Sequence, residues 1–193
     1  MPVPMDFLDE RKRELRKQVR ERMPRPGTDA FTSASLAAQE RLASWVLRHD
    51  ESVQMVALYR ALPSECGTLE LAKLLEEMGR QICYPVVGED QRELRFRRGT
   101  GFAAGALGIE EPTGDMVELA DLNLLVVPAV AVDAAGRRLG RGRGHYDATL
   151  ALCECPSVAL VFDSQLVPEV PVGEHDRRVD AVCTESRIVE CTG

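Results

Sequence analysis

The chain has 193 residues, of which 45% are hydrophobic and 28% charged, and this composition excludes an intrinsically disordered protein. Its length predicts a single globular domain over residues 1–193. Lysine and arginine number 24 against 31 aspartate and glutamate residues, and the net charge of -7 argues against a nucleic-acid partner.

The apolar runs of the sequence are all too short to span a bilayer. They cover residues 53–58, 122–132 and 158–162. We therefore expect a cytoplasmic protein without a membrane partner, and we take a monomer as its expected state. The six cysteines are Cys66, Cys83, Cys153, Cys155, Cys183 and Cys191. Because they form no CxxC pair, we predict that they are reduced thiols.

The first predicted element is a helix over residues 6–22, which contain neither glycine nor proline. Residues 10–25 carry eight lysines or arginines against three glutamates, a local charge of +5. Lys12, Arg16 and Arg20 are four residues apart, so they share one helix face, and like charges at this spacing weaken a helix. The face either binds an anion or is a solvated basic surface partly offset by the glutamates.

A second amphipathic helix is predicted over residues 35–48, with Trp45 in the core. The run 53–58 is typical of a buried strand. The next helix carries an apolar face between Leu71 and Met78, and Gly79 is expected to end it.

The remaining elements continue an alternation of strands and helices. We predict strands at 81–87 and 93–97, a glycine-rich loop at 99–114, a strand at 122–132 covered on both faces, a helix after Tyr146 and a strand at 158–162. This order predicts an α/β fold, in which three α/β/α layers surround a mostly parallel, Rossmann-like open sheet.

The strongest local feature is a glycine- and arginine-rich segment, residues 133–147, directly after the most hydrophobic predicted strand. Ligands of open α/β sheets bind beyond the carboxyl ends of strands, where glycines allow backbone N–H groups to approach phosphates. Four arginines lie within 137–143, with no acidic residue between 134 and 146. A polyphosphate would relieve their repulsion. The segment matches neither a Walker loop nor a dinucleotide fingerprint, and its alternative interpretation is a solvated surface loop.

Two carboxylates lie near this segment in the predicted fold. Asp147 follows the glycines at once, and Asp176 follows the strand at 158–162. Mg²⁺ is commonly held by one or two carboxylates together with phosphate oxygens, so both are candidate ligands. Each is equally compatible with a helix cap or a turn. The histidines and cysteines show no metal-binding spacing.

These residues resemble a known family. The segment Arg138-Leu-Gly-Arg-Gly-Arg-Gly-His-Tyr-Asp147 is similar to the RLGxGxGYYD motif of 5-formyltetrahydrofolate cyclo-ligases, also called 5,10-methenyltetrahydrofolate synthetases. The supporting matches are Lys12 to Arg16 (KxxLR), Tyr59 with Glu65 and Thr68 (Y…E…T), Gly108 to Pro112 (GIxEP), and Val170-Pro171 followed by His175-Asp176 and Val179-Asp180 (P…HD..VD).

The resemblance implies an ATP- and Mg²⁺-dependent conversion of 5-formyltetrahydrofolate to 5,10-methenyltetrahydrofolate, with ADP and phosphate as by-products. Phosphoryl transfer to the formyl oxygen would give an imidate phosphate, which N10 then attacks as phosphate leaves.

The resemblance also implies roles for individual residues. Arg141 and Arg143 would be catalytic, neutralising the transferred phosphoryl group. ATP would be bound by Lys12, Arg16, Arg138, Leu139, Gly140, Arg141, Gly142, Arg143, Gly144, His145 and Tyr146. Asp147 and Asp176 would hold Mg²⁺. The folate would be bound by Glu65, through the pterin N–H groups, and by packing on Tyr59 and Tyr146.

The sequence departs from the family pattern at two places. His145 stands where the family usually has tyrosine or phenylalanine, and Arg60 and the segment 128–130 differ near the expected pocket. Two alternatives therefore remain beside the folate enzyme. One is an RNA-associated or regulatory module that binds polyanions through the basic helix and the arginine loop. The other is a related ATP-dependent ligase or kinase that acts on another small molecule.

Overall fold

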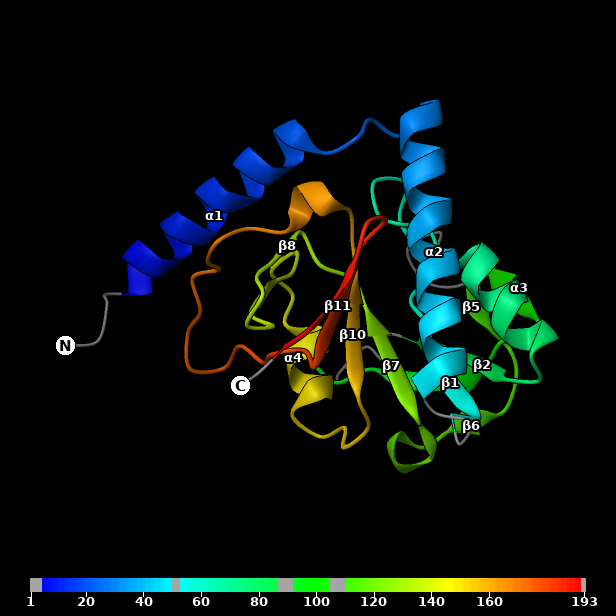
Figure 1. The fold of residues 1–193 in the computed structure, drawn as a ribbon. Coiled ribbons are helices and arrows are strands. Elements are labelled where there is room, and N and C mark those ends of the chain that lie inside the picture. The colour runs from blue at the N-terminus through cyan, green and yellow to red at the C-terminus, as the bar shows by residue number, and fades with distance from the viewer. Residues whose placement is uncertain (1–4, 50–52, 87–91, 105–109, 192–193) are drawn as a thin grey trace.

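An eight-stranded sheet forms the centre of the protein in a computed structural model that describes residues 5–49, 53–86, 92–104 and 110–191 (Figure 1). The strands follow the order β12-β11-β10-β7-β1-β2-β3-β6. Their bounds are β1 Met55–Ala57, β2 Gln81–Val86, β3 Arg95–Arg98, β6 Met116–Val117, β7 Leu124–Val127, β10 Ser157–Leu160, β11 Ala181–Cys183 and β12 Ile188–Glu190.

The five central strands, from β11 to β2, are parallel, and the strands that flank them at either edge pair antiparallel. The chain order of this sheet reverses between β1 and β7, and ligands of open α/β sheets bind beside such a reversal, at the carboxyl ends of the strands. The predicted α/β fold with a mostly parallel open sheet is confirmed.

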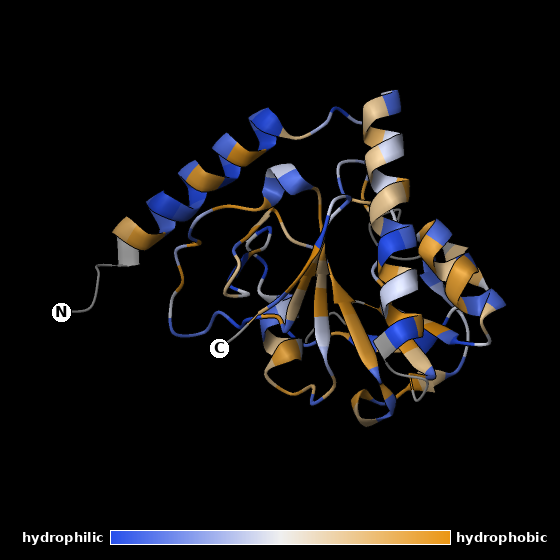
Figure 2. Cartoon of the chain, in the orientation of Figure 1, coloured by the Kyte–Doolittle hydropathy of each residue, from blue (hydrophilic) through white to orange (hydrophobic). Residues whose placement is uncertain are grey.

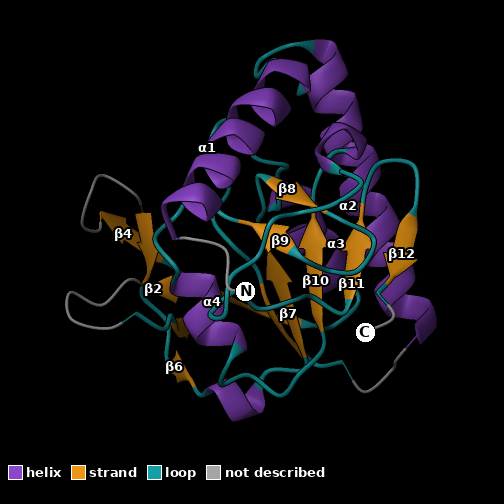
Figure 3. Ribbon diagram, turned by 90° about the vertical axis from the view of Figure 1, so that its left-hand side faces the viewer, coloured by secondary structure: helices purple, strands orange, loops and turns teal. Residues whose placement is uncertain are grey.

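Helices cover the two faces of the sheet unequally. The long α2 (Asp29–His49) and α3 (Leu69–Glu77) pack on one face, whereas the short α4 (His145–Leu150) lies on the other with the 3-10 helix η2 (Leu119–Asp121) (Figures 1 and 3). The four residues of β7 are all buried because alternate side chains enter the two cores. None of the described helices is long and apolar enough to cross a membrane.

The first helix, α1 (Met5–Arg22), does not cover a sheet face. It crosses beyond the carboxyl ends of the strands and contacts β8 (Ala131–Val132) and the 3-10 helix η3 (Asp163–Gln165) (Figure 3). Its apolar stripe, seen among hydrophilic residues in Figure 2, packs through Val19 into a small core cluster. The charged side of this helix is therefore free to take part in a site at the carboxyl edge.

Two predicted elements are differently built in the structure. The run 122–132 is divided into β7 and β8 because Pro128 has no N–H to continue the ladder. β8 instead pairs with β9 (Arg138–Leu139) in a separate hairpin. The expected loop at 99–114 contains a second hairpin, β4 (Phe102–Ala104) with β5 (Glu110–Pro112).

The helix ends follow local rules that the sequence shows only in part. α3 ends as predicted, since Gly79 has a φ of 78° and Arg80 N donates to the Leu75 carbonyl at 2.9 Å. α2 begins at Asp29, earlier than the predicted residue 35. Thr28, just before it, caps the helix, since its Oγ1 accepts a hydrogen bond from Phe31 N at 3.3 Å. Trp45 is half-buried at the edge of the core instead of inside it.

Candidate functional site at the carboxyl edge of the sheet

A buried carboxylate shapes the segment that leads into the glycine loop, residues 140–144. Asp133 is 1% exposed and its Oδ2 accepts hydrogen bonds from Arg137 Nε at 2.7 Å and Val170 N at 2.9 Å. Its Oδ1 accepts the backbone N–H groups of Ala135 and Arg137. Within this turn, Gly136 has a φ of 77°, and a Cβ there would lie 2.2 Å from the Val179 carbonyl oxygen. Only glycine fits this position.

The glycine loop itself uses left-handed backbone at two positions. Gly142 has a φ of 104° and Gly144 a φ of 75°. Gly144 is the N-cap of α4, and its carbonyl accepts Ala148 N at 3.0 Å. Both glycines are needed because side chains disfavour this conformation. The turn leaves Arg141 and Arg143 exposed at the surface.

The basic face of α1 contacts this loop, although the two segments are far apart in the sequence. Arg16 Nε donates to the Gly140 carbonyl at 2.9 Å. Lys12 Nζ lies 2.5 Å from Asp176 Oδ2, which also accepts the backbone N–H of Gly173 at 2.5 Å. Burial lowers the pKa of Arg16, and the nearby charge of Arg20 lowers it further. An additional anion would relieve this excess of positive charge.

A buried guanidinium lies behind the loop. Arg138 is 4% exposed, and its Nη2 donates to Asp147 Oδ1 at 3.0 Å, an oxygen that also accepts Arg177 N at 3.0 Å. Burial lowers the pKa of Arg138, whereas the charges of Asp147 and Asp176 oppose that shift. Among the described residues, the buried Arg138 Nε has no hydrogen-bond partner. Buried polar groups are normally satisfied, so this donor is consistent with a ligand at the site.

The loop after β1 meets the glycine loop from the other side of the strand reversal. Arg141 Nε donates to Glu65 Oε1 at 2.8 Å, and Arg141 Nη2 donates to Ser64 Oγ at 3.1 Å. Glu65 Oε2 accepts Leu62 N at 2.9 Å, which fixes the carboxylate at the loop. The residues predicted for the two substrates, Glu65 and Arg141, therefore lie in direct contact.

Not every predicted site residue lines this region. Tyr59 is 2% exposed, and its hydroxyl donates to the Cys66 carbonyl at 2.7 Å, so its ring lies in the core and offers no face to a ligand. Burial raises the pKa of Tyr59 well above its ordinary value. Thr68 Oγ1 donates to the Tyr59 carbonyl at 2.7 Å. Both residues shape the Glu65 loop from within. Of the predicted GIxEP match, residues 108 and 109 lie outside the described residues.

The two aromatic positions at the start of α4 differ in their surroundings. Tyr146 is half-buried between the two cores, and the Arg138 guanidinium carbon lies 5.8 Å from its ring centroid. Burial raises the pKa of Tyr146. His145 Nδ1 lies 2.8 Å from the Arg92 carbonyl, so its imidazole is tied to the loop before β3. Arg60, the other departure from the family pattern, stacks 4.4 Å from the ring centroid of Phe102.

Each of the two predicted metal ligands, Asp147 and Asp176, is bound by a cation. No group of three or more His, Cys, Asp or Glu side chains in the described part of the chain is arranged to hold an ion. Asp147 binds Arg138 through one carboxylate oxygen, and Asp176 binds Lys12 through one oxygen. Among the described residues, no hydrogen bond forms to the second oxygen of either carboxylate. This donor set fits Mg²⁺ only when phosphate oxygens complete the coordination.

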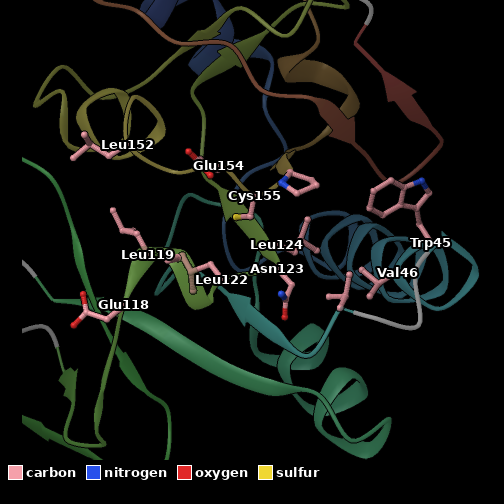
Figure 4. Close-up of a pocket in the computed structure, with 13 residues that line it drawn as sticks. Trp45, Val46, Glu118, Leu119, Leu122, Asn123, Leu124, Leu152, Glu154 and Cys155 are labelled. Atoms are coloured by element: carbon pink, nitrogen blue, oxygen red, sulfur yellow. The ribbon is translucent and has the colours of Figure 1, made fainter.

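A hollow of about 890 Å³ lies at the opposite edge of the sheet (Figure 4). Its wall includes Trp45, Leu119 and Leu152, together with the carboxylates of Glu118 and Glu154. No lysine or arginine is among the described residues that line it. A phosphate-bearing ligand is therefore not expected there.

Sequence reasoning missed three residues that build the site: Ser64, Asp133 and Arg177. Asp133 stands at the start of the predicted segment, but nothing in the sequence shows that it accepts four hydrogen bonds. Ser64 and Arg177 contribute through contacts across the fold, a hydroxyl and a backbone N–H, for which sequence carries no signal.

Comparisons with known proteins point to one family. A profile of the 5-formyltetrahydrofolate cyclo-ligase family matches residues 8–185. The chain is 32% identical to the 5-formyltetrahydrofolate cyclo-ligase of Mycolicibacterium smegmatis, over 77% of this chain and 82% of that one. It is 28% identical to the mouse enzyme of the same name, over 90% and 93%. The solution structure of a 5,10-methenyltetrahydrofolate synthetase from Aquifex aeolicus superposes with a TM-score of 0.77 at 27% identity, covering 94% of this chain and 93% of that one.

Proposed function

Because the chain belongs to the 5-formyltetrahydrofolate cyclo-ligase family, and is thus an enzyme, a ligase of folate metabolism, we propose that it converts 5-formyltetrahydrofolate to 5,10-methenyltetrahydrofolate with consumption of Mg-ATP. The observation that carries the proposal is the convergence of Arg16, Arg138 and Arg141 at the glycine loop. Arg16 lies more than a hundred residues before Arg138 and Arg141 in the sequence, and a triphosphate is the ligand whose charge the three groups match.

The ATP side of the site consists of α1 and the glycine loop. Lys12 and Arg16 bind phosphate oxygens from one side, and backbone N–H groups of residues 140–144 bind them from the other. Arg138 holds the loop from behind and offers its unsatisfied Nε to the ligand. Arg141 and Arg143, exposed on the loop, neutralise charge on the phosphoryl group as it moves. Positioning and neutralisation are the main tasks of a protein in phosphoryl transfer.

Asp147 and Asp176 would hold Mg²⁺ together with phosphate oxygens. The bound ion would screen the phosphate charges from the attacking oxygen. Lys12 and Arg138 contact these two carboxylates at 2.5 and 3.0 Å, so both cations also lie close to the proposed metal ligands. The same two cations would therefore be available to the phosphates of Mg-ATP.

The folate side begins at Glu65. A carboxylate accepts the paired N–H groups of a pterin ring, and Tyr146 offers a half-buried ring edge nearby. When the pterin takes Glu65, Arg141 loses its partner and turns to the phosphoryl group. The formyl oxygen attacks the γ-phosphorus as the bond to ADP breaks; N10 then attacks the formyl carbon and the phosphate leaves.

The test is incubation of the purified protein with 5-formyltetrahydrofolate and Mg-ATP while the absorbance of the methenyl product is followed. We expect product that depends on both ATP and Mg²⁺, with one ADP formed per folate. ATP binding without product would favour a ligase or kinase for another small molecule. Polyanion binding with a steep salt dependence and no turnover would favour the RNA-associated module.

A further inference from the structure

Two thiols that the proposed reaction does not use lie side by side after α4. The Sγ atoms of Cys153 and Cys155 are 3.1 Å apart, and both side chains are half-buried. The ordinary disulfide bond is about 2.05 Å long, so the sulfurs need to approach by about 1 Å to bond. The tetrahedral geometry of zinc would hold two thiolates about 3.8 Å apart, which makes the pair too close for that ion.

The backbone on both sides of the pair is fixed. Cys153 N donates to the Thr149 carbonyl at 3.0 Å, which ends α4. On the other side, the Pro156 carbonyl accepts Leu125 N at 2.9 Å, so the chain is tied to the sheet just before β10. Only the exposed Glu154 lies between the cysteines. The short distance between the sulfurs is thus set by the fold. Formation of a disulfide bond would require only a local movement of the two side chains.

The two thiols are electronically unequal. The hydrogen bond that the two thiols share lowers the pKa of Cys153, and a weaker one from the Cys155 backbone N–H lowers it further. The same contact, together with burial, raises the pKa of Cys155. This direction favours Cys153 as the thiolate and the nucleophile of the pair, with the remaining proton on Cys155.

The other four cysteines provide an internal contrast. Burial raises the pKa of Cys66, Cys83 and Cys183 to about 12 each. It raises the pKa of the half-buried Cys191 to about 11. Thiols of this kind react slowly at neutral pH because the thiolate is the reactive form.

The pair is accessible from a small hollow of about 390 Å³. Leu150 and Ser157 form part of its wall, and the exposed side chains of Arg178 and Asp180 lie at its rim. The hollow lies next to the end of α4, away from the glycine loop at its start. A small reagent can reach the sulfurs without entering the proposed nucleotide site.

We propose that Cys153 and Cys155 form a thiol modification site that reacts with low-molecular-weight disulfides. The Cys153 thiolate attacks one sulfur of the small disulfide, a mixed disulfide forms, and the other half leaves as a thiolate. Cys155 then loses its proton, its sulfur attacks Cys153, and the second half leaves. In sum, two protein thiols are oxidised and one small disulfide is reduced to two thiols.

The chain offers a direct readout of this reaction. Trypsin cleaves after Arg143 and Arg177, and the peptide Gly144 to Arg177 contains no other lysine or arginine and no other cysteine. The reduced protein, as the full chain, is exposed to oxidised glutathione, and its remaining thiols are then alkylated. After digestion with trypsin, the mass of this peptide is measured by mass spectrometry. We expect a peptide lighter by two hydrogen atoms and without alkylation, while the other cysteines are alkylated.

Variants separate the two roles. Cys155→Ser should trap one glutathione on Cys153, and Cys153→Ser should slow modification of this peptide by at least about tenfold. Cys191→Ser, a half-buried cysteine outside the pair, should behave as the unaltered protein does. The proposal is overturned if both thiols of the folded, unaltered protein remain alkylatable after such exposure. It is equally overturned if Cys153→Ser is modified as fast as the unaltered chain.

Discussion

The two edges of the parallel sheet contrast in shape and in charge. The amino edge has a hollow of about 890 Å³ with two glutamates in its wall. The carboxyl edge carries the cations of α1 and the glycine loop, and a buried arginine with an unsatisfied Nε. The difference shows that charge and topology identify the proposed nucleotide site, because a hollow without lysine or arginine among its described lining residues does not suit a phosphate-bearing ligand.

The largest expected effect comes from Asp147. Asp147→Asn should abolish turnover, a loss of at least about 100-fold in kcat, because the amide is a poor ligand for Mg²⁺. Its oxygen still accepts the hydrogen bonds from Arg138 and Arg177, so circular dichroism should show an unchanged fold. Retained turnover would remove Asp147 from the metal site.

The next effect is expected at Arg141. Arg141→Ala should lower kcat by about 100-fold, because it removes charge from the moving phosphoryl group. The side chain is 42% exposed, so stability should change little. Arg187→Ala, which removes an exposed arginine remote from the loop, is the matched control. Equal kcat values in the two variants would contradict the role of Arg141.

Gly136 tests how the loop is supported. Gly136→Ala should cost about 3 kcal/mol or more of unfolding free energy, because its Cβ would meet the Val179 carbonyl. Gly27→Ala is the control: Gly27 has a similar φ of 80°, but no atom lies within 4 Å of its Cβ position. It should cost only about 1–2 kcal/mol. Chemical denaturation measures both, and equal losses would show that the close contact is unimportant.

The smallest effect is expected at the amino edge. Glu118→Gln and Leu152→Ser alter the wall of the hollow at the amino edge and leave the carboxyl edge untouched. The KM values for ATP and for the folate should stay within about twofold of those of the unaltered enzyme. Steady-state kinetics checks this, and a tenfold rise in either KM would place that substrate at the amino edge, in contradiction to the proposed site.

The sequence predicted those parts of the molecule that depend on local patterns. Alternating strands and helices indicated the sheet, and the glycines and arginines of 137–144 indicated the loop. The division of the 122–132 run was missed because hydrophobicity there continues through Pro128. Tyr59 was expected at the ligand because a motif does not show burial. Three of the hydrogen bonds to the Asp133 carboxylate come from the turn that follows it, but the fourth comes from Val170, and no local pattern contains that contact.

The central claim is that α1 and the glycine loop bind one triphosphate together. Isothermal titration calorimetry of Mg-ATP with Arg16→Ala tests it directly, with Lys17→Ala, an exposed residue on the same helix, as the control. We predict at least a tenfold loss of affinity for Arg16→Ala, about 1.4 kcal/mol, and almost none for Lys17→Ala. Unchanged affinity in Arg16→Ala would contradict the claim.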